Sequence, residues 1–284
     1  MTRLALAQFS CSNQYQENID KAIYFVKEAK KLGASLLLLP ELFERNYFCQ
    51  KMDPARFAFA EEEENSKTLS IFSTLAKQEE IVLPISFFEK DKDKFYNSIV
   101  VFDKDGRNLG KYRKTHIPSG NLYEEKYYFS SGDTGFQVFP SSAGNIGIGI
   151  CWDQWFLETG RSLALLGADY LLFPTAIGSE PDGYDSKTHW QNVMKGQAAL
   201  NILPVLAANR IGKEEEKDTS ITFYGSSFIA DEIGEVVEEA SRDEERILFH
   251  DFDLDKIKQR REDWSIFDDR HPEMYHLLTK EKEK

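Results

Sequence analysis

The stretches KLGASLLLLPEL (residues 31–42) and LLGADYLLFPTA (residues 165–176) follow one pattern that decides the fold class. In each, a glycine ends a helical segment and a short apolar run leads to a proline. A run that is apolar on both faces is typical of a parallel strand buried inside a sheet. Helical spacing precedes both runs, from about residue 18 to Gly33 and from Trp155 to Leu166. The chain therefore contains two similar α/β units.

A strand opens each unit, and further elements complete two sheets. RLALAQF (3–9) opens the first unit and GNIGIGI (144–150) opens the second. Between the units, SIVVFDKDGRNLGKYRK (98–114) alternates apolar and polar residues around an Asp-Gly turn, which predicts an antiparallel hairpin. The remaining elements are a helix at 187–200 and strands at 203–209, 226–231 and 246–252. We expect an α/β protein with a pair of sheets, each carrying helices on one side.

The chain is expected to form one domain followed by a tail. No stretch rich in Pro, Gly or Ser divides residues 1–260. Residues 261–284 mix aromatic and charged side chains without a clear period, and we expect this tail to pack at a subunit interface. The charge runs at 61–65 and 213–218 predict solvated loops.

The composition excludes several function classes. The 284 residues include 35 basic and 48 acidic side chains, and a net charge of -13 does not indicate a nucleic-acid-binding surface. The three cysteines lie far apart and predict neither a disulfide framework nor a metal site. No apolar run approaches the roughly 20 residues that span a bilayer, and the N-terminal segment resembles a strand rather than a signal peptide. We expect a cytoplasmic protein without membrane partners.

Cys151 lies where an apolar strand meets the polar-aromatic turn WDQWF (152–156). A lone cysteine in such a place is usually a small core residue. However, open α/β sheets gather functional groups at the carboxyl ends of their parallel strands. A cysteine just before a helix also meets free backbone N–H groups, which favour the thiolate and can stabilise an oxyanion. Cys151 is therefore a candidate nucleophile.

A cysteine nucleophile needs a base, and the sequence offers two kinds. Five histidines qualify by residue type: His116, His189, His250, His271 and His276. The carboxylate of Glu41 also qualifies, because Glu41 follows the buried strand of the first unit as Cys151 follows a strand of the second. A cation would complete the site. GKYRKTHIP (110–118) offers Lys111, Arg113 and Lys114, and spacing alone does not select among them.

Taken together, LLLLPELF (36–43), GKYRKTHIP (110–118) and GIGICWDQWFLE (147–158) resemble the three motifs of the nitrilase superfamily of carbon–nitrogen hydrolases. The resemblance extends from the first strand to about Arg270. It implies a four-layer α-β-β-α sandwich and a homo-oligomer built from dimers. It also implies catalysis by Glu41, Lys114 and Cys151 without a metal or another cofactor.

Within the superfamily, the chain is similar to the branch that hydrolyses N-carbamoylputrescine, a cationic small molecule of polyamine biosynthesis. ELFERNYFCQ (41–50), EKYYFSSGDTGF (125–136), FPTAIGSEP (173–181) and ANRIG (208–212) carry this resemblance. It implies that Glu125 is a second active-site glutamate. It further implies four substrate-binding residues, of which the last binds the distal ammonium: Tyr47, Tyr123, Trp152 and Glu180.

One segment departs from that branch. SGNLY (119–123) replaces the usual Asp-Gly-Pro-Gly-Tyr, so that the hydroxyl of Ser119 stands where a carboxylate is expected. Two alternative functions make different demands on the sequence. An amidohydrolase for N-carbamoyl-β-alanine or an ω-amide would need an arginine or lysine for the distal carboxylate, in place of Glu180. A non-catalytic scaffold would be favoured by the loss of a catalytic side chain, and all three are present.

Overall fold

The structure, a computed structural model, describes residues 1–120, 122–179 and 183–280. In its first sheet, β1 (Thr2–Gln8) lies between β14 (Arg246–Phe252), which is antiparallel to it, and β2 (Leu36–Leu38), which is parallel. A parallel bridge between Leu36 and Val82 joins β2 to an antiparallel meander. The meander consists of β3 (Leu83–Asp91), β4 (Lys94–Phe102) and β5 (Asn108–Arg113). The predicted hairpin is confirmed.

The second sheet has the order β13-β12-β9-β8-β7-β6. Its strands are β6 (Val138–Ser141), β7 (Gly144–Ile148), β8 (Tyr170–Pro174), β9 (Val205–Ala208), β12 (Phe228–Ala230) and β13 (Val236–Glu239). Strand β8 lies parallel to β7, as β2 lies parallel to β1. The two repeated runs of the sequence therefore form equivalent strands.

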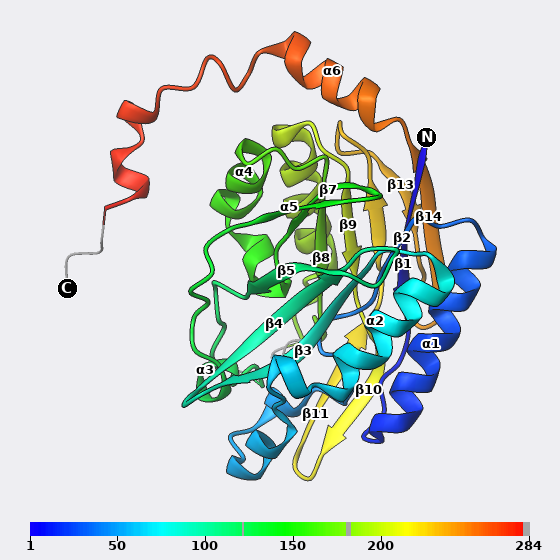
Figure 1. Cartoon of the computed structure of the whole chain (residues 1–284). Helices are drawn as coiled ribbons and strands as arrows, with labels where there is room; N and C mark the ends of the chain where they lie inside the picture. The colour runs from blue at the N-terminus through cyan, green and yellow to red at the C-terminus, as the bar shows by residue number, and fades with distance from the viewer. Residues whose placement is uncertain (121, 180–182, 281–284) are drawn as a thin grey trace.

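Helices cover the outer face of each sheet (Figure 1). Helices α1 (Tyr15–Lys31) and α2 (Lys67–Glu79) pack on the first sheet, and α4 (Leu157–Leu165) and α5 (Lys187–Asn201) pack on the second. Within β2, Leu36 and Leu38 face the second sheet, whereas Leu37 faces the helices. The predicted α-β-β-α sandwich is confirmed. No helix of the described residues is long and apolar enough to cross a membrane.

The charge run at 213–218 is not a solvated loop, and this prediction was wrong. It lies in a hairpin of β10 (Ile211–Glu216) and β11 (Thr219–Tyr224). Alternation along β10 turns Glu214 inward, where it is 5% exposed and pairs with Arg210 at 2.8 Å. The sequence pattern did not predict the burial of Glu214, because no apolar residue marks this position. The inward side chain is stabilised by a buried cation rather than by hydrophobic neighbours. The other run, at 61–65, contains a 3-10 turn at Glu63–Asn65.

The helix predicted from Trp155 to Leu166 is divided in the structure. A 3-10 turn, η4 (Cys151–Trp155), comes first, and α4 begins at Leu157. Further along, α6 (Leu254–Trp264) continues past residue 260, and an extended segment with exposed apolar side chains follows it (Figure 1). The packing of this tail at a subunit interface stays a prediction.

Glu44 is a buried carboxyl group in the turn that follows β2. Its Oε2 atom has no hydrogen-bond partner among the described residues. Burial first, and then the charge of Glu61, raise the pKa of Glu44 to about 8. An unfolded chain has the ordinary carboxyl pKa of 4.5. Between these values the folded state binds more protons than the unfolded state, so Glu44 makes the protein less stable as the pH rises from 4.5 to 8.

Replacing Glu44 with glutamine should therefore stabilise the protein more at pH 8 than at pH 5. We expect the gain in Tm over the natural chain to be larger at pH 8 by about 2 °C or more. Thermal unfolding of both proteins at the two pH values measures it. Glu64→Gln, at an exposed position, is the matched control and should show no such difference. Equal gains at both pH values would contradict the assignment.

Candidate active site

Lys114 follows β5 and lies between two carboxylates. Its Nζ atom donates to Glu41 Oε1 at 2.8 Å and to Glu125 Oε2 at 2.7 Å. Glu41 follows β2, and Glu125 begins the short helix α3 (Glu125–Tyr128). All three side chains are at most 1% exposed. Burial alone would lower the pKa of Lys114, but Glu125 and Glu41 outweigh it and hold this pKa well above its usual value. The group therefore contains one cation and two carboxylates.

The two oxygens of Glu41 have different surroundings. Asn97, on β4, donates from Nδ2 to Oε1 at 2.7 Å, the same oxygen that accepts from Lys114. Oε2 has no hydrogen-bond partner among the described residues. Two donors thus fix the orientation of the carboxylate and leave Oε2 to accept a proton. Sequence reasoning missed Asn97 because a polar residue in an alternating strand resembles an outward-facing one.

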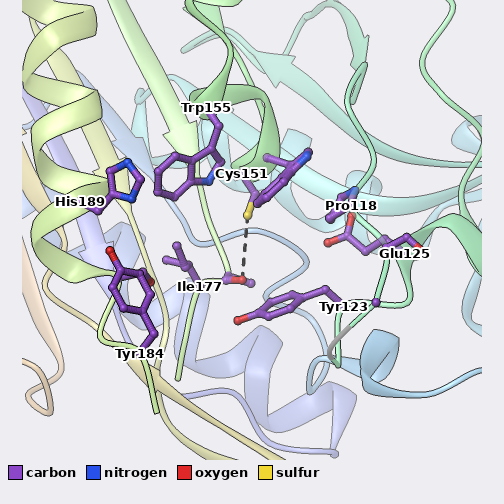
Figure 2. Close-up of a pocket in the computed structure, with 13 residues that line it drawn as sticks. Pro118, Tyr123, Glu125, Cys151, Trp155, Ile177, Tyr184 and His189 are labelled. Carbon is purple, nitrogen blue, oxygen red and sulfur yellow. Dashed lines mark hydrogen bonds between the residues drawn. The ribbon is translucent and has the colours of Figure 1, made fainter. Parts of the chain in front are cut away.

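Cys151 begins the turn η4 with a backbone φ of +42°, a conformation that is costly for any residue but glycine. Its Sγ atom lies 3.9 Å from the carbonyl oxygen of Ala176 (Figure 2). Burial, and then the negative charge of Glu41, raise the pKa of the Cys151 thiol well above its usual value, although Lys114 opposes this. The expectation that the turn favours the thiolate was therefore wrong, because burial outweighs the effect of the turn. The thiol needs a base.

Asp153 holds the turn that carries Cys151. Its buried carboxylate accepts from the N–H of Ile150 at 2.9 Å, the hydroxyl of Tyr112 at 2.8 Å and the N–H of His116 at 2.9 Å. The Nδ1 atom of His116 lies 2.7 Å from the same carboxylate. His116 therefore supports the turn through Asp153.

None of the other histidines is placed beside Lys114. His189 lies across the cavity, with its ring 5.0 Å from that of Trp155. His250 is on β14, and His271 and His276 are in the tail. Of the two kinds of base that the sequence offered, the structure brings the carboxylate of Glu41 to the site. Among the described residues, no His, Cys, Asp or Glu side chains form a group of three or more that could hold a metal ion.

A cavity of about 350 Å³ opens beside Cys151. In Figure 2, Cys151 lies in the middle of the cavity, with Glu125 on one side and with His189 and Tyr184 on the other. The described lining residues include no lysine or arginine: Pro118, Ser119, Gly120, Tyr123, Glu125, Cys151, Trp152, Trp155, Ala176, Ile177, Tyr184, Ser186 and His189.

The predicted substrate-binding residues have different places. Tyr123 and Trp152 line the cavity. Tyr47 is 1% exposed and lies behind Glu125, to which its hydroxyl donates at 2.7 Å, so its contact with a ligand is indirect. Its ring lies 5.7 Å from that of Tyr123. Glu180 lies outside the described residues.

Removing the Asn97 amide should impair the carboxylate that it orients. A hydrogen bond to a charged group contributes about 1.5–3 kcal/mol, so Asn97→Ala should lower kcat/KM roughly 10- to 100-fold. The rate of ammonia release in a steady-state assay measures it. Ser98→Ala is the matched control, because the neighbouring hydroxyl points to Glu89, on the other face of β4. Equal activities of the two variants would argue against the role of Asn97.

The comparisons with known proteins agree with this geometry. The sequence model of the family described as carbon–nitrogen hydrolase matches residues 3–262. An N-carbamoylputrescine amidase of Oryza sativa subsp. japonica is 47% identical over 99% of this chain and 96% of its own length. A citrullinase of Francisella tularensis is 46% identical over 98% of both chains. The crystal structure of a carbon–nitrogen hydrolase from Helicobacter pylori G27 has a TM-score of 0.94 at 35% identity, covering 99% of each chain. The chain belongs to the carbon–nitrogen hydrolase family of the nitrilase superfamily.

Proposed function

We propose that this enzyme hydrolyses N-carbamoylputrescine to putrescine, carbon dioxide and ammonia. The relatives named above for N-carbamoylputrescine and citrulline support a substrate with a terminal ureido group. One observation carries the choice of the distal group. Away from Glu125, the cavity is lined by the aromatic rings of Trp155 and Tyr184 and by His189. Among the described residues, no lysine or arginine lines it. The three cysteines are free thiols, which suits a reducing cytoplasm.

The reaction begins with attack of Cys151 Sγ on the ureido carbon. Because the thiol is protonated in the resting protein, its proton moves to Oε2 of Glu41 as the C–S bond forms. The ammonium of Lys114 and the backbone N–H of Trp152 stabilise the negative oxygen of the tetrahedral intermediate. Each well-placed donor of this kind contributes about 3–4 kcal/mol.

Collapse of this intermediate releases the amine. Glu41 returns its proton to the nitrogen of putrescine as the C–N bond breaks, and a carbamoyl group remains on Cys151. Glu41 then takes a proton from water as the water oxygen attacks the carbamoyl carbon, and it returns this proton to Sγ of Cys151 as the C–S bond breaks. The carbamic acid that leaves decomposes to carbon dioxide and ammonia. Glu125 takes no proton in this scheme; it holds the position and the charge of Lys114 at 2.7 Å.

The aromatic rings supply a reason to bind an ammonium at the distal end. Trp155 and Tyr184 line the far part of the cavity, and a ring face attracts a cation by about 0.5–2 kcal/mol. A carboxylate in the same place would lose its hydration without gaining a lysine or arginine among the described residues. This favours N-carbamoylputrescine over N-carbamoyl-β-alanine and over ω-amides of dicarboxylic acids.

Citrulline is the second candidate substrate. It has the same ureido group and a distal ammonium, with an added carboxylate on the carbon that bears the ammonium. The Francisella relative supports it, and His189 at the cavity wall is a described side chain that could pair with this carboxylate. The preference between the two substrates therefore depends on whether the distal carboxylate is tolerated.

A panel of ureas that differ only at the distal end decides between them. We expect kcat/KM to be highest for N-carbamoylputrescine and lower for neutral N-pentylurea by about 2- to 30-fold, the range of one cation–π interaction. L-citrulline should be poorer than N-carbamoylputrescine, and N-carbamoyl-β-alanine should be poorest. Ammonia release measures all four. A higher kcat/KM for citrulline than for N-carbamoylputrescine would overturn the proposal and favour a citrullinase.

The covalent mechanism predicts the behaviour of a variant that lacks the nucleophile. Cys151→Ala should lower kcat by roughly 10⁶-fold, as removal of the nucleophile does in other hydrolases. Its thermal unfolding should be nearly unchanged, because alanine fills most of the same buried space. The two measurements are ammonia release and circular dichroism on heating. Turnover at the natural rate would exclude a Cys151 adduct.

A further inference from the structure

Arg210 is a fully buried cation that the reaction scheme does not use. It follows β9, at the start of the hairpin β10–β11, and its side chain is 0% exposed. Its partner is Glu214, four residues further along the chain on β10, at 2.8 Å. A buried ion pair of this kind contributes little net stability compared with apolar side chains of the same size. Its hydrogen bonds indicate another role.

The guanidinium of Arg210 holds the backbone of the turn that carries Glu41. Nη2 donates to the carbonyl oxygens of Glu41 at 2.7 Å and of Leu42 at 2.9 Å, and Nη1 donates to that of Arg45 at 3.2 Å. Leu42 has a φ of +46°, and such a conformation persists only where surrounding contacts hold it. A planar guanidinium with fixed donors can bind several carbonyl groups at once. Arg210 therefore fixes the backbone of Glu41, the proposed base, although the two residues are 169 positions apart in the sequence.

The same ion pair reaches the second carboxylate of the site. While Oε1 of Glu214 accepts from Arg210, its Oε2 accepts from the backbone N–H of Tyr47. The hydroxyl of Tyr47 donates to Glu125 at 2.7 Å. Phe223, on β11, contacts both parts: its ring lies 5.3 Å from the guanidinium carbon of Arg210 and 5.7 Å from the ring of Tyr47.

We propose that Arg210 and Glu214 are a positioning pair that sets the places of Glu41 and Glu125 around Lys114. The pair touches the backbone of Glu41 directly and reaches Glu125 through Tyr47. It does not touch the reacting atoms. The hairpin β10–β11, which lies beside the segment that follows β2 (Figure 1), is then part of the catalytic framework. The inference rests on the proposed role of Glu41 as the base. A displacement of about 1 Å can cost a factor of 10² in rate.

Arg210→Lys tests the positioning role, because it keeps the charge but cannot bind all the carbonyl groups that the guanidinium binds. We expect kcat for N-carbamoylputrescine to fall about 10- to 100-fold and KM to change less than about 3-fold, since the cavity wall is unaltered. The matched control is Phe25→Leu, in the core between α1 and the first sheet. Phe25→Leu should lower the Tm without lowering kcat. Both variants are assayed at a temperature at which circular dichroism shows that they are folded.

A second measurement does not depend on the substrate. Alkylation of Cys151 by iodoacetamide, followed by mass spectrometry of the Cys151 peptide across pH, reports the pKa of the thiol beside Glu41. We expect the alkylation profile of Arg210→Lys to shift to lower pH, because a displaced Glu41 carboxylate raises the pKa of the thiol less, and that of Phe25→Leu to match the natural chain. Glu214→Gln keeps an oxygen that can accept from the backbone N–H of Tyr47. This variant replaces Arg210→Lys in the test if Arg210→Lys does not fold. It should show the same changes, with kcat about 3- to 10-fold lower, because hydrogen bonds to a neutral acceptor are weaker.

The outcomes separate the two proposals. Natural kcat and a natural alkylation profile in Arg210→Lys, or in Glu214→Gln where only that variant folds, would overturn the positioning role. If the natural chain does not release ammonia from N-carbamoylputrescine but the alkylation profile still shifts in the variants, the proposed substrate is wrong and the positioning role stands.

Discussion

The contact of one buried ammonium with two buried carboxylates determines how the rest of the site is arranged. Lys114 follows β5, Glu41 follows β2, and Glu125 begins α3, so the ion pairs join three separate parts of the chain. Without the ammonium, two carboxylates would be buried beside each other, and a buried ion without its partner costs several kcal/mol. The spacing between β2 and β5 in the first sheet, and the place of α3 over the end of β5, are therefore tied to catalysis as well as to packing.

Burial, and then the charges of this group, explain why the proposed nucleophile is kept as a thiol. The negative charges of Glu41 and Glu125 raise the pKa of Cys151, whereas the positive charge of Lys114 opposes them. A thiolate would add further negative charge to a buried place. In the proposed mechanism, the proton therefore leaves Cys151 only as negative charge moves to the substrate oxygen, where Lys114 stabilises it.

The sequence predicted the parts of the fold that rest on apolar pattern, and it missed those that rest on buried charge. The repeated runs at 36–39 and 170–174 form equivalent strands, because both of their faces are covered. Glu214 lies in the charge run that was predicted to be a solvated loop, and nothing local in the sequence shows that Arg210 is its buried partner. Lys114 could not be told from Lys111 and Arg113 by spacing, because its partner Glu41 lies 73 residues away. Only the resemblance to a family selected it.

The proposed catalytic group, with the arginine that positions it, and the distal end of the cavity are built from different kinds of structure. Glu41, Lys114, Cys151 and Arg210 each follow a strand closely, after β2, β5, β7 and β9. A strand end is held by the hydrogen bonds of the whole sheet, so these groups keep their geometry while other parts of the chain vary. The distal end is formed by segments between elements, including Ser119, Ile177 and Tyr184. Loops tolerate substitution far better than strand ends do. Relatives that are 46–47% identical to this chain can therefore catalyse the same kind of carbon–nitrogen hydrolysis on substrates that differ at the distal end. One such relative is named for N-carbamoylputrescine and another for citrulline.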